Sequence, residues 1–158
     1  MLDLGHAILD LGFWLANNPA PVRVSASLDR SAQDRSVEQS GGAFVVCENG
    51  AAIFVDVTWH HVGEGERFGV GIRGSKGTAG INPLHVWKEL HGVPTDVAPT
   101  GSVGRENAFT ASFRAEWAHF LAAVRGEAKA PGLQEQLTLH RVLDAIYRSA
   151  DEGNEVEL

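Results

Sequence analysis

The residues best suited to chemistry stand in the opening stretch of the chain, MLDLGHAILDLGFWL. Asp3, His6 and Asp10 interrupt an otherwise apolar helical segment. An aspartate and a histidine that face a carbonyl or an alcohol can donate or accept a proton there. We therefore take Asp3 and His6 as candidate catalytic residues and Asp10 as a candidate substrate-binding residue. The alternative is structural, with Asp3 capping the helix through its first N–H groups and Asp10 lying on a polar face.

The elements that must position these residues follow from the hydrophobic pattern. Apolar residues at helical intervals predict a helix over 4–16, which Asn17, Asn18 and Pro19 end. Alternation of period two predicts a strand over 22–27. In AFVVCENGAAIFVDVTW, two β-rich runs flank Asn49-Gly50, a dipeptide that tolerates the positive φ angles of a type I′ turn. We expect a hairpin there.

The rest of the chain predicts few further strands and two long helices. In chain order we expect a strand over 67–73, an irregular stretch over 75–107, helices over 110–125 and 133–151, and a short strand over 155–158. Gly153 is placed to cap the last helix. Helix, hairpin-connected strands and helices form an α+β pattern, and we expect a single domain over 1–158.

Three other groups of residues suggest chemistry less strongly. GVGIRG (69–74) has the spacing of a dinucleotide fingerprint, but SKGTAGINP follows it, so no helix begins there to hold a pyrophosphate. His60 and His61 are adjacent, and on a strand they point to opposite faces, which disfavours a shared metal ion. Cys47 has no local group that would activate it, and we expect a small buried side chain.

Composition excludes several classes of partner. The formal net charge is -7 and the 13 Lys and Arg are scattered among acids, which excludes a nucleic-acid partner. The apolar part of the opening stretch is too short for a membrane span, and no basic segment precedes it. One cysteine allows no internal disulfide, as in a reducing compartment, so we expect a cytoplasmic protein.

Five segments together resemble the C-terminal domain of the glucose–fructose oxidoreductase/inositol dehydrogenase (Gfo/Idh/MocA) family. DLGHAILDLGFWLANNPAPVRVSAS is similar to the family's D-x-G-x-H-x-x-D opening, with its apolar helix, proline and strand. ENGAAIFVDVTW is similar to the family's hairpin, and IRGSKGTAGI to its strand and turn. FRAEWAHFLAAVRGE resembles its F-x-x-E-x-x-x-F helix, and VLDAIYRSADEGNEVEL its closing D-A-x-Y-x-S-A-x-x-G. The segments keep the family's order over nearly the whole chain.

The resemblance implies an open, mostly antiparallel sheet with helices packed on one face and the other face available for oligomerisation. It also implies NAD(P)-dependent oxidation or reduction of a hydroxyl group on a sugar, inositol or related polyol. In that scheme this domain binds the substrate, while a preceding Rossmann domain holds NAD or NADP and contributes a catalytic lysine. Asp3 and Asp10 match the family's two aspartates.

Two departures from the family's pattern bear on function. The Rossmann half is absent from this chain, so we expect neither NAD nor NADP to bind the chain alone. The family's histidine position holds Ala7, and His6 stands one residue earlier, a rotation of about 100° on a helix. His6 replaces that histidine only if the helix begins after Gly5.

Two hypotheses follow. In the first, the chain is the substrate-binding and oligomerisation domain of such an oxidoreductase, inactive alone, with a Rossmann domain encoded upstream. In the second, it is a non-catalytic homo-oligomeric or partner-docking module derived from that family. Ala43 and Val45 alternate with Phe44 and Val46, so both faces of that strand are apolar, as expected if one face meets a second subunit.

Overall fold

The computed structural model describes residues 1–30, 37–65, 67–99, 107–130 and 132–158. The chain divides into two compact units. The first unit comprises residues 1–66 and 132–158, and the second unit comprises residues 67–131. The prediction of a single domain concerns how these units pack together and stays a prediction.

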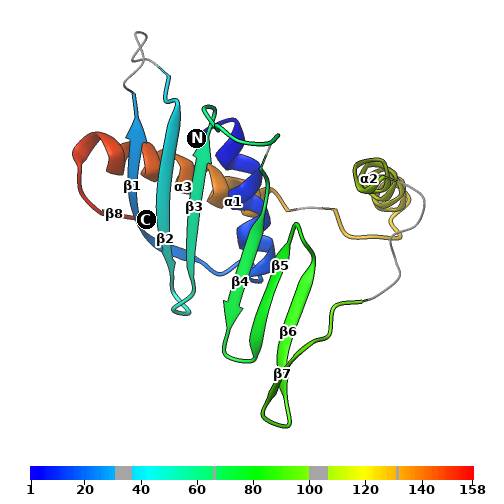
Figure 1. Ribbon diagram of the computed structural model, residues 1–158. Helices are drawn as coiled ribbons and strands as arrows, with labels where there is room; N and C mark the ends of the chain where they lie inside the picture. The colour runs from blue at the N-terminus through cyan, green and yellow to red at the C-terminus, as the bar shows by residue number, and fades with distance from the viewer. Residues whose placement is uncertain (31–36, 66, 100–106, 131) are drawn as a thin grey trace. The chain divides into compact units, whose positions relative to one another are not determined.

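The first unit is one antiparallel sheet with two helices on one face. Its elements are α1 (Leu4–Leu15), β1 (Pro21–Asp29), β2 (Ser40–Cys47), β3 (Ala52–Thr58), α3 (Leu133–Glu152) and β8 (Val156–Glu157). The strand order is β3-β2-β1-β8. Helix α3 lies against β1 and helix α1 against β3, on the same side of the sheet (Figure 1). The predicted α+β class, with helices on one face of an open antiparallel sheet, is confirmed.

Helix α1 forms almost where the periodicity places it. Gly5, Leu9 and Phe13 are its buried residues, one per turn, and they face β3 and α3. The helix ends because Asn17 and Asn18 adopt positive φ angles of 66° and 49°, a conformation that asparagine tolerates better than most residues. The exposed face of α1 is thereby fixed relative to the sheet.

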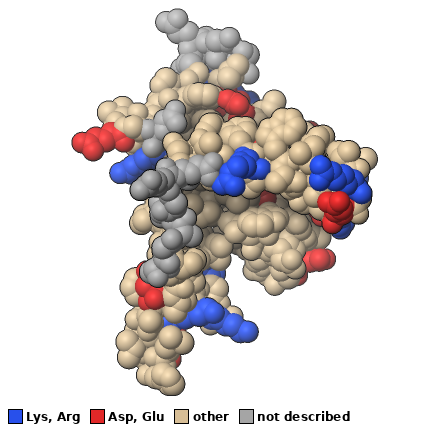
Figure 2. Space-filling model, turned by 90° about the vertical axis from the view of Figure 1, so that its right-hand side faces the viewer, with Lys and Arg blue, Asp and Glu red and all other residues tan. Residues whose placement is uncertain are grey.

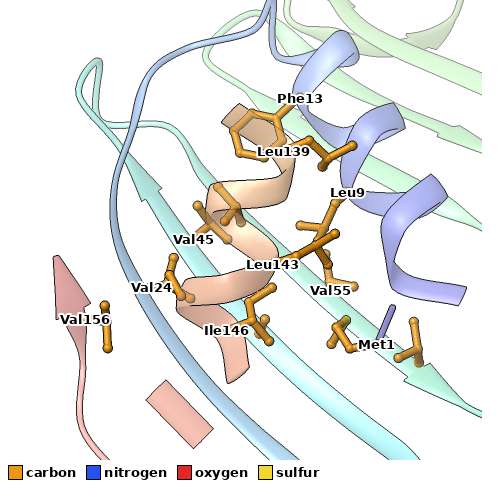
Figure 3. Close-up of a cluster of buried hydrophobic side chains, with 14 of the residues drawn as sticks. Met1, Leu9, Phe13, Val24, Val45, Val55, Leu139, Leu143, Ile146 and Val156 are labelled. Carbon is orange, nitrogen blue, oxygen red and sulfur yellow. The ribbon is translucent and has the colours of Figure 1, made fainter. Parts of the chain in front are cut away.

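Helix α3 supplies most of the remaining core. Its buried stripe packs with inward side chains of the sheet, as Figure 3 shows for Leu139, Leu143, Ile146, Val24 and Val45. Gly153 ends the helix in the left-handed conformation with φ 70°, which confirms its predicted role as the cap.

A buried hydroxyl also joins α3 to the sheet. The Ser149 Oγ accepts a 3.0 Å hydrogen bond from the Ala26 backbone N–H of β1. The same hydroxyl donates to the Asn154 carbonyl at 2.6 Å. Its donor and acceptor capacity are both used, so the polar group is buried without an unsatisfied hydrogen bond.

The β2–β3 hairpin is confirmed, but its predicted turn type is wrong. Gly50 has φ 80°, whereas Asn49 does not have a positive φ. The Gly50 N–H donates to the Cys47 carbonyl, and the Cys47 N–H donates to the Ala51 carbonyl. These bonds enclose a longer loop with glycine alone in the left-handed region, and the Asn49 carboxamide accepts from the Ala51 N–H instead.

The second unit contains a second antiparallel sheet, most of which the sequence did not predict. Its elements are β4 (Val70–Gly74), β5 (Gly77–Ile81), β6 (His85–Leu90), β7 (Val93–Asp96) and α2 (Ala108–Val124), and the strand order is β4-β5-β6-β7. The expectation of an irregular stretch over 75–107 is therefore wrong for 77–96. Pro83 and Gly92 lie between strands, whereas Gly80 lies within β5 and Pro94 within the edge strand β7. The turn between β6 and β7 has positive φ at both His91 and Gly92, as a type I′ turn requires.

Helix α2 begins two residues before its predicted start. The Asn107 side chain caps it by accepting a 2.8 Å hydrogen bond from the Phe109 N–H. The aromatic residues of α2, including Phe113, Trp117 and Phe120, are about half-exposed.

Candidate functional site

The predicted site residues lie on the solvent side of α1. Asp3 and Asp10 are exposed, and His6 is half-buried. His6 follows Asp3 by three residues and precedes Asp10 by four, the two spacings at which helical side chains are neighbours. The fold therefore brings the three predicted residues to one side of a helix whose opposite side is anchored in the core.

Asp3 does not act as the helix cap that the structural alternative requires. Its backbone has φ -83° and ψ -68°, and its carboxylate accepts no cap hydrogen bond. Side-chain capping needs an extended residue before the helix, whereas Asp3 is already helical. Its carboxylate is exposed and available for another partner.

His6 belongs to the helix rather than to a segment that precedes it. The Gly5 N–H donates a 2.8 Å hydrogen bond to the Met1 carbonyl, so the helical pattern already includes Gly5. The condition under which His6 would occupy the family histidine's place, a helix that begins after Gly5, is therefore not met. Ala7 is exposed beside the two aspartates, and His6 turns toward α3.

The neighbour of His6 is a residue that the sequence analysis missed. The ring of His6 lies against that of His140 on α3, with ring centroids 5.6 Å apart and planes tilted by 39°. More than 130 positions separate the two histidines, so no local spacing connects them. The two imidazoles form a polar pair between α1 and α3, and imidazole is a side chain suited to general acid–base chemistry.

A hollow of about 490 Å³ opens next to Asp10. It is bounded by the end of α1, the residues before β1, the β2–β3 turn and the first turns of α3. Glu48, Glu135 and Arg141 line it together with Asp10. They were also missed, because charged residues from separate segments carry no common pattern in the sequence.

The glycine-rich stretch over 69–74 is part of a sheet. Strand β4 turns directly into β5 through a hairpin in which Gly74 pairs with Gly77. The dinucleotide motif needs a helix N-terminus after its glycines, and this segment supplies a strand. The residues present do not fit a nicotinamide dinucleotide at this place.

The histidine pair and the cysteine agree with their structural interpretations. His60 and His61 follow the end of β3 and are exposed, and the His60 Nε2 lies 2.7 Å from the Gln39 Oε1. Within the described ranges, no three His, Cys, Asp or Glu side chains group together as metal ligands do. Cys47 is buried, and burial, reinforced by the charge of Glu48, raises the pKa of its thiol.

The described surface shows no concentration of positive charge on the face drawn in Figure 2, where Lys and Arg alternate with Asp and Glu. Of the helices that the structure describes, none is both long and apolar enough to cross a membrane.

Comparison with known proteins places this fold. No protein-family model matches the sequence, and no curated protein matches it. Among solved structures, an oxidoreductase domain protein from Kribbella flavida is 20% identical with a TM-score of 0.84, over 98% of this chain and 48% of that one. A putative myo-inositol dehydrogenase from Sinorhizobium meliloti is 20% identical with a TM-score of 0.73, over the same shares of the two chains.

A third solved structure carries its ligands. The WlbA dehydrogenase from Bordetella pertussis, in complex with NADH and UDP-GlcNAcA, is 24% identical with a TM-score of 0.70, over 98% of this chain and 43% of that one. The fold is that of one half of such an oxidoreductase. The structural neighbours are oxidoreductases of the Gfo/Idh/MocA type, so the resemblance read from the sequence is confirmed at the level of fold. The chain spans about half the length of the solved structures that it matches.

Proposed function

We propose that this chain is the substrate-binding and oligomerisation domain of an NAD(P)-dependent oxidoreductase that acts on a sugar, inositol or related polyol. One observation carries the proposal: the fold matches 98% of this chain but only 48% of the Kribbella flavida oxidoreductase. The unmatched half of such an enzyme is where we place the nicotinamide site, since 69–74 of this chain form a hairpin.

The residues on α1 would act on the substrate hydroxyl. The Asp3 carboxylate accepts a hydrogen bond from that hydroxyl and orients it, and Asp10 accepts from a neighbouring hydroxyl. His6, which lies against His140 and not in the register of the family's histidine, assists the transfer of the hydroxyl proton. NAD or NADP, held by the other half of the complete enzyme, supplies the hydride chemistry. Such a site depends on positioning, which contributes about 7–11 kcal/mol when reactants are held together, so the lone chain is expected to be inactive.

A fluorescence titration tests this division of labour. NADH and NADPH are titrated separately against the purified chain while nicotinamide fluorescence is followed. Neither should bind at micromolar concentration. Saturable binding in that range would place a cofactor site within this chain and overturn the proposal.

The alternative is a non-catalytic homo-oligomeric or partner-docking module, which the outer face of the first sheet favours. Phe44 and Phe54 are directly paired across β2 and β3 on the face away from the helices, with exposures of 44% and 71%. Two adjacent exposed phenylalanines are typical of a contact surface. We propose that a second copy of the chain covers them, whether the chain is an oxidoreductase domain or a non-catalytic module.

Light scattering measures the assembly directly. The chain should be larger than a monomer at micromolar concentration, and Phe54→Glu should shift it toward the monomer. Val62→Glu is the matched control, because Val62 is 97% exposed in a loop. A monomeric wild-type chain would contradict pairing through this face. A Rossmann partner encoded upstream and a cytoplasmic location complete the proposal and stay predictions.

A further inference from the structure

The hollow beside Asp10 has the dimensions of a small-molecule site. Its volume of about 490 Å³ falls within the range of roughly 300–1,000 Å³ typical of ligand pockets. All of its lining belongs to the first unit, so its shape depends only on elements whose mutual packing is fixed by one core.

The floor of the hollow is apolar and rigid. Phe13 from α1 and Leu139 from α3 form it, with exposures of 6% and 2%, and Figure 3 shows the two side chains next to each other at one end of the core. Since both belong to the core, the floor is present before any ligand arrives. A ring with an apolar face can therefore lie on it without a loss of side-chain freedom.

The rim is charged, and its charges are not neutralised. Asp10, Glu48, Glu135 and Arg141 are exposed around the opening. Over the described ranges, no ion pair or side-chain hydrogen bond involves these four side chains. By contrast, three arginines of the same unit each contact a carboxylate: Arg23 contacts Glu155, Arg30 contacts Asp151, and Arg148 contacts Glu152.

We propose that this hollow binds a polyhydroxylated ring that carries no acidic group, and that an amino substituent on the ring strengthens the binding. Ring hydroxyls would donate to the carboxylates of Asp10 and Glu135 and accept from the guanidinium of Arg141, while the C–H face of the ring contacts the exposed edge of Phe13. Three carboxylates against one guanidinium disfavour an anionic ligand. The inference rests on the proposed function, from which it takes the class of ligand, a polyol. It adds a preference for neutral or positively charged rings and a contribution from residues of α3.

The test compares three rings that differ mainly in charge. Glucosamine, glucose and glucuronate are titrated separately into the full isotope-labelled chain, and backbone amide shifts are followed by NMR. We expect shifts in the first turns of α3 and near Glu48, with affinity in the order glucosamine, glucose, glucuronate. Glu135→Gln should weaken glucosamine binding roughly tenfold, the effect of losing one charge-assisted hydrogen bond. Asp56→Asn, on the opposite face of the sheet, should leave it unchanged.

Each alternative outcome overturns the inference, and the first two leave the proposed function standing. Binding that is unaffected by Glu135→Gln places the ring elsewhere, tightest binding of glucuronate refutes the charge argument, and no binding of any ring in the millimolar range removes the site. Failure of the proposed function shows itself differently, as micromolar binding of NADH by the lone chain. Circular dichroism of the Glu135→Gln variant verifies that this exposed substitution leaves the fold intact.

Discussion

Glu38 gives the sharpest prediction, because it is a buried carboxylate with partners at Met1 and on α3. It is 9% exposed and accepts hydrogen bonds from the Met1 amino group and, at 2.5 Å, from the Tyr147 hydroxyl. Burial by itself would raise its pKa, but the bonds from Met1, Tyr147 and a backbone N–H outweigh burial and lower the pKa from 4.5 to about 2.

The sign and size of the effect follow from linkage. A carboxylate whose pKa is depressed in the folded state stabilises that state above its unfolded pKa, and this contribution is lost as the pH falls through the folded pKa. For Glu38, this stabilisation is lost between the unfolded pKa of 4.5 and the folded pKa of about 2. A gap of this width corresponds to about 3 kcal/mol of unfolding free energy.

The assay is urea unfolding of this chain with Met1 as its first residue, and of its Glu38→Gln variant, at several pH values. Hydrogen exchange of the Val45 and Ile146 amides, in the core of the first unit, reports the unfolding. The difference in unfolding free energy between the two proteins should be largest near neutral pH and shrink by about 3 kcal/mol as the pH approaches 2. Tyr147→Phe should reduce that dependence, because it removes one of the donors. A difference that stays constant with pH would refute the proposed role of these hydrogen bonds.

Three further predictions concern the core, the second sheet and the thiol. Leu9→Ala removes a side chain with 0% exposure and should cost about 2–5 kcal/mol of unfolding free energy, measured by urea denaturation. Gly77→Ala should disrupt the β5–β6 pairing, because Gly77 has φ 151° and a Cβ there would lie 2.1 Å from the Trp87 carbonyl oxygen. Amide exchange measures the effect. Gly71→Ala is the control, since a Cβ at Gly71 meets nothing within 4 Å. The Cys47 thiol should react with a disulfide reagent far more slowly in the folded protein than in urea, since burial raises its pKa, and equal rates would contradict its burial.

The first unit was predictable from sequence because its elements are long and periodic. Helix α3 repeats its apolar stripe over about three turns from Leu139 onward. The burial of β2 alternates cleanly between Ala43 and Cys47. The second sheet escaped prediction because β5 and β7 are short and contain glycine or proline, and their pairing depends on neighbours in space. The β6–β7 turn relies on His91, which is not an obvious residue for positive φ.

The candidate site was predictable only where one helix carries it. Asp3, His6 and Asp10 are near in sequence, so the opening stretch could suggest them. His140 and Arg141 come from a helix that the fold brings back beside α1, and only tertiary packing creates that proximity. Likewise, the helical backbone conformation of Asp3 depends on the hydrogen bond that the Gly5 N–H donates to the Met1 carbonyl.

The central claim is that this chain binds the substrate and leaves the nicotinamide to another domain. One amide NMR experiment on the labelled chain tests both parts, with NADH added first and inositol or a neutral sugar second. The account predicts no change with NADH, followed by saturable shifts on α1 around Asp3 and Asp10 with the polyol. Saturable shifts over 69–74 with NADH, and none on α1 with any polyol, would contradict it.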